Sequence, residues 1–214
     1  MLCPICEKRP AKRFCPAKGE KICAVCCGTG REVTIDCPPD CTYLIQAHRY
    51  EAEHRRPLSP DEFPYKEVEF PVQFVYEHWP VVSGLAGTIL AFQARSKQLN
   101  DGTARLALEA LAETYRTLET GIYYERPPDL PVARALYAQI AEFLGEFRKQ
   151  EADRTGFPSL KDANIFRLLV FMLRMCKQET NGRPLSRAFL GFLRERFPSS
   201  DARKEKEASR IIVP

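Results

Sequence analysis

Cysteine is the residue type with the clearest chemical potential in this sequence, because eight of its nine cysteines lie within the first 41 positions. These eight are Cys3, Cys6, Cys15, Cys23, Cys26, Cys27, Cys37 and Cys41. Clustered cysteines form disulfides in oxidising compartments and bind metal in reducing ones. The chain opens without the basic and apolar regions of a secretory signal. We therefore expect a cytoplasmic protein whose cysteines bind metal.

The spacing of the cysteines favours zinc, because two CxxC pairs and a closing Cx3C allow tight turns to aim paired sulfurs at one ion. Eight sulfurs complete two four-cysteine sites, so we expect two structural Zn²⁺ ions in an interleaved arrangement. One ion would take Cys3, Cys6, Cys23 and Cys26, and the other would take Cys15, Cys27, Cys37 and Cys41. The alternative is a single ion at the first set, with Cys27 a packed thiol and the other three a weak or empty site.

Residues 3–41 also resemble a B-box or related cross-brace zinc finger. The resemblance is carried by Cys3-x2-Cys6, the later lone Cys15 and the run Gly19-Glu20-Lys21-Ile22-Cys23-Ala24-Val25-Cys26. The segment is similar as well to N-terminal modules of uncharacterised bacterial proteins. It departs from the B-box pattern at Lys18, where an acidic or cysteine ligand is expected, and at Cys37 and Cys41, where histidines usually close the site. The resemblance covers less than a fifth of the chain and implies a structural protein-interaction module.

The formal net charge of +4 overstates the basic character of the chain, because it leaves every cysteine neutral. Residues 1–44 contain seven lysines and arginines and five acidic residues, which gives a charge of +2. Eight thiolates with two Zn²⁺ ions would contribute −4 and bring this segment to −2. The basic side chains then neutralise thiolate charge, which weakens the case for a nucleic-acid surface.

Outside the cysteines, the pattern predicts a mainly α protein with a small zinc module followed by an all-α bundle of about five helices. The module is expected over residues 1–56, with a trailing polar helix from Cys41 to about Arg56 and Asp40 as its candidate N-cap. Four prolines make residues 57–71 an extended connector. The bundle is expected over residues 72–198, and the charged tail at residues 199–214 is expected to be disordered.

Hydrophobic periodicity and capping signals place the five helices of the bundle. They are expected from Val72 to about Leu99 with a bend or restart at Pro80, from the cap Asp101 to near Gly121, after Pro127-Pro128-Asp129, from Ser159 to Asn181, and from about Pro184 to Phe197. The fourth is apolar nearly all round, so we expect it at the centre of the bundle. Its longest apolar run is interrupted by Arg167 and Arg174, which argues against a membrane span.

Three further features have a plain alternative explanation. Glu51-x2-His54 has the spacing of a carboxylate di-metal motif, but the required second copy is absent and a solvated helix face is favoured. The basic end of the same helix can contact phosphates. It comprises His48, Arg49, His54, Arg55 and Arg56. Cys176 lies on an apolar helix face, where a buried, inert thiol is the expectation.

The sequence contains no phosphate loop, nucleophile elbow or Cys/His catalytic set. The leading hypothesis is therefore a non-enzymatic zinc protein that serves as an interaction or scaffold module, with another protein as its partner and no membrane contact. The alternative is nucleic-acid binding through the finger and the adjacent basic helix. A third hypothesis is an enzyme of unknown reaction in the helical domain, with zinc purely structural.

Overall fold

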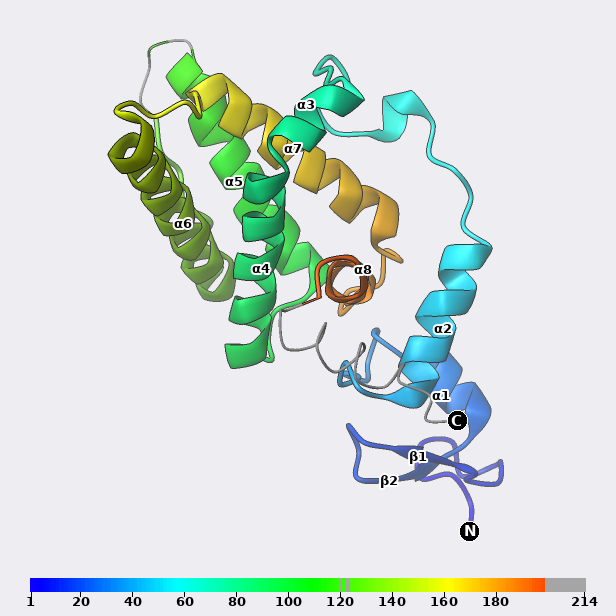
Figure 1. The fold of residues 1–214 in the computed structure, drawn as a ribbon. Helices are drawn as coiled ribbons and strands as arrows, with labels where there is room; N and C mark the ends of the chain where they lie inside the picture. Colours follow the sequence, from blue (N-terminus) through cyan, green and yellow to red (C-terminus); the bar gives the residue numbers. More distant parts are fainter. Residues whose placement is uncertain (120, 122–123, 199–214) are drawn as a thin grey trace, which may run out of the picture.

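The computed structural model describes residues 1–119, 121 and 124–198, and it is mainly helical, with 59% helix and one two-stranded sheet. Figure 1 shows a small cysteine-rich module at one end of the molecule and a bundle of helices at the other. The predicted mainly α fold is confirmed. The expected disorder of residues 199–214 lies outside the described residues.

The module combines a short hairpin with two helices. Its elements are β1 (Arg13–Cys15), β2 (Glu20–Ile22), α1 (Ala24–Gly30) and α2 (Thr42–Glu53). The hairpin is antiparallel, with Cys15 opposite Glu20, and Gly19 closes its turn with a φ of +70° that favours glycine. The trailing helix is present, but it ends at Glu53 rather than near Arg56, and its N-cap is Cys41 rather than Asp40.

The connector between module and bundle is largely irregular, with one 3-10 turn, η1 (Pro60–Glu62), closed by a capping box between Ser59 and Glu62. Its path along the bundle is held by Arg174 of the bundle. The Arg174 guanidinium donates to the carbonyls of Pro64 and Val68, at 3.1 and 2.9 Å. The connector is therefore attached to the bundle through its backbone.

Among the residues that the structure describes, six helices form the bundle. They are α3 (Val72–Glu77), α4 (Trp79–Arg95), α5 (Asp101–Glu119), α6 (Pro131–Thr155), α7 (Asp162–Glu179) and α8 (Ala188–Arg196). The predicted restart near Pro80 is confirmed, since α3 ends before His78 and Pro80 lies in the first turn of α4, where a missing N–H costs no helical bond. The predicted start of α7 at Ser159 was wrong, because the helix begins at Asp162 and the Ser159 hydroxyl donates to Glu151 instead.

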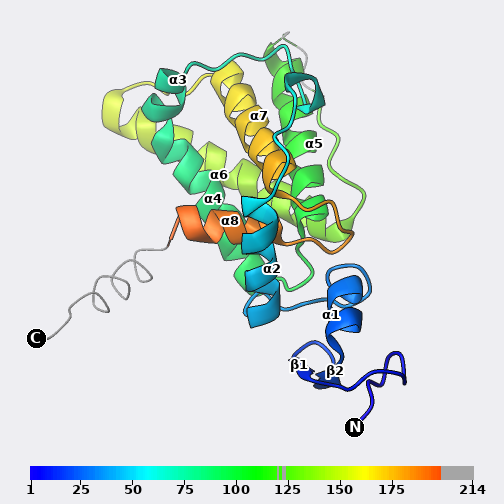
Figure 2. The ribbon, with the colours of Figure 1, turned by 90° about the vertical axis from the view of Figure 1, so that its right-hand side faces the viewer.

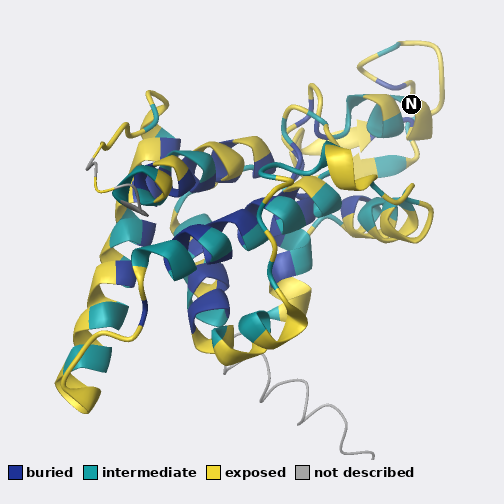
Figure 3. Ribbon diagram, turned by 90° about the horizontal axis from the view of Figure 1, so that it is seen from above, coloured by how far each residue is buried: buried dark blue, intermediate teal, exposed yellow. Residues whose placement is uncertain are grey.

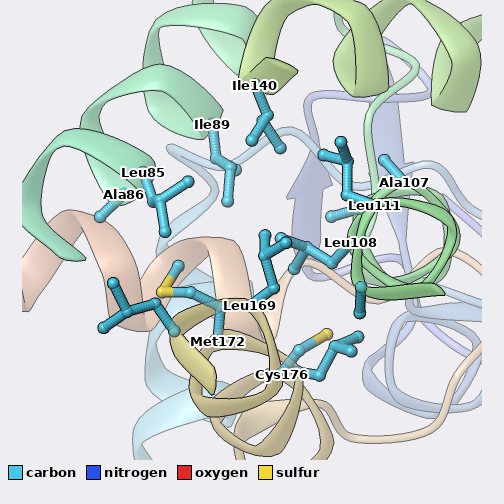
Figure 4. Packing of buried hydrophobic residues seen from close by; sticks show 14 of the residues in the cluster. Leu85, Ala86, Ile89, Ala107, Leu108, Leu111, Ile140, Leu169, Met172 and Cys176 are labelled. Carbon is cyan, nitrogen blue, oxygen red and sulfur yellow. The ribbon is translucent and has the colours of Figure 1, made fainter. Parts of the chain in front are cut away.

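Helix α7 lies at the centre of the bundle, as its apolar sequence predicts, and packs most extensively against α5. Figure 4 shows its Leu169, Met172 and Cys176 meeting side chains from α4 and α5. Figure 3 shows how the buried residues gather between the helices. Among the described residues, no helix has both the length and the apolar character that crossing a bilayer requires.

The module approaches the bundle beside α8. Figures 1 and 2 both place α2 next to this helix. A Cβ added to Gly191 of α8 would lie 3.9 Å from the Nδ1 atom of His48 on α2. Helix α8 therefore lies between the module and the centre of the bundle.

Candidate metal centre

Four of the eight module cysteines gather into one group. The sulfurs of Cys3, Cys6, Cys23 and Cys26 all lie within 4.8 Å of one another, and Cys6 Sγ is 3.9 Å from Cys23 Sγ. Four thiolates bound tetrahedrally at about 2.3 Å from one ion are separated by about 3.8 Å. The group therefore has the dimensions required to hold a metal ion, and it is the first of the two sets that the sequence predicted.

Two different local structures bring these sulfurs together. Cys3 and Cys6 lie in a turn closed by the Glu7 N–H bond to the Cys3 carbonyl at 2.8 Å and by the Leu2–Pro10 bridge. Cys23 is the N-cap of α1, where its sulfur accepts the backbone N–H of Cys26 at 3.3 Å. A turn and a helix N-terminus thus each supply one CxxC pair.

The electrostatics of the group favour binding of a cation. Burial raises the pKa of Cys3, but the backbone N–H groups of Cys23 and Ile5 outweigh this and lower it to about 6. The pKa of Cys26 is raised to about 12, chiefly by its interaction with Cys23. The sulfurs cannot all ionise beside one another without a cation, because each thiolate disfavours the next. The neighbouring Arg9 responds to this charge, since Cys23 raises its pKa.

The other four predicted ligands are packed in the same module without forming a second group. Cys15 and Cys37 are buried, Cys27 and Cys41 are half-buried, and no further set of three sulfurs lies within 4.8 Å in the part of the chain that the structure describes. They are nevertheless neighbours. Burial raises the pKa of Cys37, and the charges of Cys41 and Cys15 raise it further.

A buried carboxylate connects the module to the bundle. Glu32, between α1 and α2, has no exposed surface, and its backbone takes a left-handed conformation with a φ of +53°. Its carboxylate bonds His48 Nε2 at 2.8 Å and accepts from Asn181 Nδ2 and the Arg187 backbone N–H, each at 2.7 Å. Burial raises the pKa of Glu32, but the bond to His48 and the other donors lower it overall.

Arg187 of the bundle, which is 6% exposed, completes this contact. We call the contact that Glu32 and Arg187 make between module and bundle the joint. Its guanidinium pairs with Asp36 and donates to the Cys37 carbonyl at 3.2 Å. It also donates to the carbonyls of Leu99 and Lys97, at 3.2 and 2.6 Å. One side chain of the bundle thus binds the loop that carries a predicted metal ligand.

The sequence pattern did not identify Glu32 or Arg187 as functional residues. They are 155 positions apart, and neither belongs to a motif. The one local signal is that an acidic residue at position 32 is followed by Val33 and Ile35 within a cysteine module. That signal is too weak to predict a buried carboxylate.

The weaker sequence features have structural roles. Glu51 accepts from Asn181 at 3.1 Å and pairs with Arg183 at 3.3 Å, so it belongs to the joint with the bundle. His54 stacks on Tyr50 and bonds its carbonyl. Cys176 is buried as expected, and burial raises its pKa. These contacts explain the residues without a second metal.

The bundle carries an open surface pocket of about 770 Å³ between α5 and residues 124–130. Its charged walls include Glu109, Glu113 and Arg116. Glu109 pairs with Arg105, and Glu113 pairs with Arg116 at 2.7 Å. Both carboxylates are therefore engaged in ion pairs, and neither is indicated as a general acid or base.

No protein-family model, curated protein or solved structure matches this chain.

Proposed function

We propose that residues 1–56 form a zinc-stabilised module with a non-enzymatic interaction or scaffold role, presented on the helical bundle. The single observation that carries the proposal is the group of four cysteine sulfurs within 4.8 Å of one another. Four thiolates at CxxC spacing are the preferred ligands of structural Zn²⁺. A structural ion supplies folding free energy to a segment too small to build an ordinary core.

A second Zn²⁺ at Cys15, Cys27, Cys37 and Cys41 is part of the proposal. Two supporting facts are the burial of Cys15 and Cys37 and the charge of Cys15, which raises the pKa of Cys37. All eight cysteines also pack into one small cluster with Ile22, Ile35 and Leu44. Thiolate ligands require a reducing environment, so we place the protein in the cytoplasm.

The proposed partner is another protein, because the module exposes apolar side chains that its own core does not use. Ile5 and Val25 are 47% and 48% exposed, and each precedes the second cysteine of a CxxC pair. Phe14 of β1 is 55% exposed. Several large apolar residues exposed on one small module agree with a protein-binding surface. The resemblance to B-box fingers agrees with this role but rests on the sequence motif alone.

Binding to nucleic acid remains the alternative, and the ion pairs of α2 and the connector argue against it. Three of the basic residues at this helix end already have acidic partners. His48 pairs with Glu32, Arg55 with Glu179 and Arg56 with Glu62, each at 2.8 Å. Side chains held in such pairs are less available for phosphates. We expect no binding to DNA or RNA even at low salt.

Metal content tests the first half of the proposal. Native mass spectrometry of the full chain should show two zinc ions that are lost with chelator. Cys6→Ser should lose one ion and Cys37→Ser the other, because they belong to different sets. Fully oxidised cysteines without metal would contradict the proposal, and one ion in the native chain would reduce it to the first set.

Capture from lysate, compared between matched variants, tests the second half. The double change Ile5→Ser with Val25→Ser should lose partners that the native chain retains, with its metal content unchanged. Tyr76→Ser is the control, because Tyr76 is 70% exposed but lies on α3, outside the module. Equal capture by all three proteins would count against an interaction surface on the CxxC turns.

A further inference from the structure

The loop between Cys27 and Cys37 is held by the bundle rather than by the module alone. The backbone N–H of Leu185 donates to the Glu32 carbonyl at 2.9 Å, and Arg183 donates to the Arg31 carbonyl at 2.9 Å. The Glu32 carboxylate and the Arg187 guanidinium add side-chain bonds in both directions. The segment between two predicted ligands therefore depends on residues 181–187 of the bundle.

This joint requires a defined loop conformation. Glu32 has a left-handed backbone, which costs a non-glycine residue free energy unless the surroundings hold it. A buried carboxylate is also destabilising whenever its partners move away. Small displacements of the loop are therefore opposed by the loss of these bonds.

The joint continues into the core through the N-terminus of α8. Ser186 donates to Asp101 Oδ2 at 2.6 Å, and Asp101 also accepts the backbone N–H groups of Phe189 and Leu190, at 3.1 and 3.3 Å. The Asp101 carboxylate thus caps α8 from another helix. At the far end of α8, Phe197 stacks on Trp79 with ring centroids 5.2 Å apart.

The two cysteine sets differ in how closely the spacing of their sulfurs matches what a metal ion requires. The sulfurs of Cys3, Cys6, Cys23 and Cys26 already have the spacing that an ion requires. The sulfurs of Cys15, Cys27, Cys37 and Cys41 have to move before all four can bind one ion. Binding that rearranges the protein is weaker than binding at a preorganised site. Two of the four, Cys37 and Cys41, lie on the segment that leads from the joint into α2.

We propose that Cys15, Cys27, Cys37 and Cys41 form a lower-affinity, regulatory zinc site whose loading is transmitted through Glu32 and Arg187 to the α7–α8 loop and α8. This inference rests on the proposed zinc module and names its regulation. Loading fixes the loop from Arg31 to Cys41 and orders residues 180–197. Loss of this ion releases them, while the first ion keeps its set and α4 to α7 keep their packing.

Hydrogen exchange on the full chain tests the coupling, with graded chelator and native mass spectrometry to count ions. Going from two ions to one should raise exchange at least tenfold in peptides covering residues 180–197, with no change in α5 and α7. The fluorescence of Trp79, the one tryptophan of the chain, should shift in the same step, because its stacking partner Phe197 is the C-cap of α8 and moves with this helix.

Four variants separate the steps. Cys37→Ser should show one ion and fast exchange at residues 180–197 in saturating zinc, and Cys41→Ser repeats this test at a less buried ligand. Glu32→Gln should retain two ions but show fast exchange at residues 180–197. Its cysteines are intact, and only the carboxylate that connects the loop to the bundle is lost. Glu53→Gln, at an exposed position of α2 away from the cysteines, should retain two ions and leave exchange at residues 180–197 near the native value.

Each other outcome has a definite meaning. No bound metal would defeat the proposed function itself. One ion at most would overturn the regulatory site while leaving the zinc module. Two ions whose stepwise loss leaves exchange at residues 180–197 unchanged would overturn the transmission through Glu32 and Arg187.

Discussion

Cys3 has no exposed surface, and burial raises its pKa, yet the backbone N–H groups of Cys23 and Ile5 bring it down to about 6. The native module therefore prefers the thiolate more strongly than the unfolded chain does. The resulting stability is fully present above pH 9, which is the ordinary pKa of a cysteine thiol, and it is lost as the pH falls from 9 to 6.

We expect the metal affinity to fall as the pH falls from 9 to 6, because the metal has to displace a proton from Cys26, whose pKa is raised to about 12, whereas Cys3 is already a thiolate in the native module. Competition with a chromophoric chelator at a series of pH values measures this. Cys26→Ser should flatten the dependence between pH 9 and 6, and Cys3→Ser should flatten it less. Identical profiles for the native chain and Cys26→Ser would contradict the role assigned to this thiol.

Glu32 is the acidic residue on which the joint depends, since its carboxylate has three partners and no contact with solvent. Glu32→Gln keeps the shape but removes the charge and places an amide donor opposite Asn181. We expect the free energy of unfolding to fall by about 2 kcal/mol, the range for hydrogen bonds to charged groups. Urea unfolding of the zinc-loaded protein measures the change. The control Glu53→Gln, at an exposed position of α2, should stay within about 0.5 kcal/mol of the native value.

At the scale of elements, α4 and α6 cross where α4 has no side chain. A Cβ added to Gly84 would overlap the Phe143 ring of α6, whereas a Cβ added to Gly87 of α4 would meet nothing within 4 Å. The two glycines lie on the same helix and are separated by less than one turn. They therefore form a matched pair for testing how closely these helices pack.

Gly84→Ala should lower the free energy of unfolding by about 1–3 kcal/mol, because overpacking moves the Phe143 ring or separates the helices. Gly87→Ala should raise it by up to about 1 kcal/mol, since alanine favours a helix more than glycine does. Thermal and urea unfolding of both variants measure the difference. Equal effects of the two changes would show that α4 and α6 adjust freely at this contact.

The start of α7 and the two strands show where local sequence patterns were insufficient to predict an element. Ser159 has the residue type of an N-cap, but Glu151 of α6 accepts its hydroxyl and also the Leu160 N–H, at 2.7 and 3.1 Å. These tertiary bonds replace the local cap, and α7 begins later than the pattern indicated. The strands β1 and β2 were not predicted, because three residues each are too short to show an alternating pattern.

At the scale of the whole molecule, the sequence was sufficient to predict those features that a local motif or a periodic apolar pattern encodes. The CxxC spacing predicted which four sulfurs gather, and the apolar residues of α7 predicted the centre of the bundle. The joint between module and bundle could not be predicted from local patterns, because Glu32 and Arg187 are 155 positions apart and come together only in the tertiary structure. A buried ion network between distant residues leaves no period and no motif in the sequence.

Chelation should therefore affect the two parts of the molecule unequally. The module contributes only α1 and α2, of 7 and 12 residues, whereas α6 alone has 25. The large apolar core lies entirely in the bundle and its connector. We expect far-ultraviolet circular dichroism to retain most of the helical signal after the metal is removed. Loss of nearly all helical signal on chelation would show instead that the bundle cannot fold without the module.

The buried thiol of Cys176 gives this protein an internal reference for counting chemical events. Its sulfur lies 3.7 Å from the Asp101 carbonyl, and burial raises its pKa, so an alkylating reagent reaches it only when the bundle opens. The remaining eight thiols of the chain belong to the module. In an intact-mass spectrum, eight adducts would mark a chain whose module had opened alone, and a ninth would mark one that had unfolded throughout.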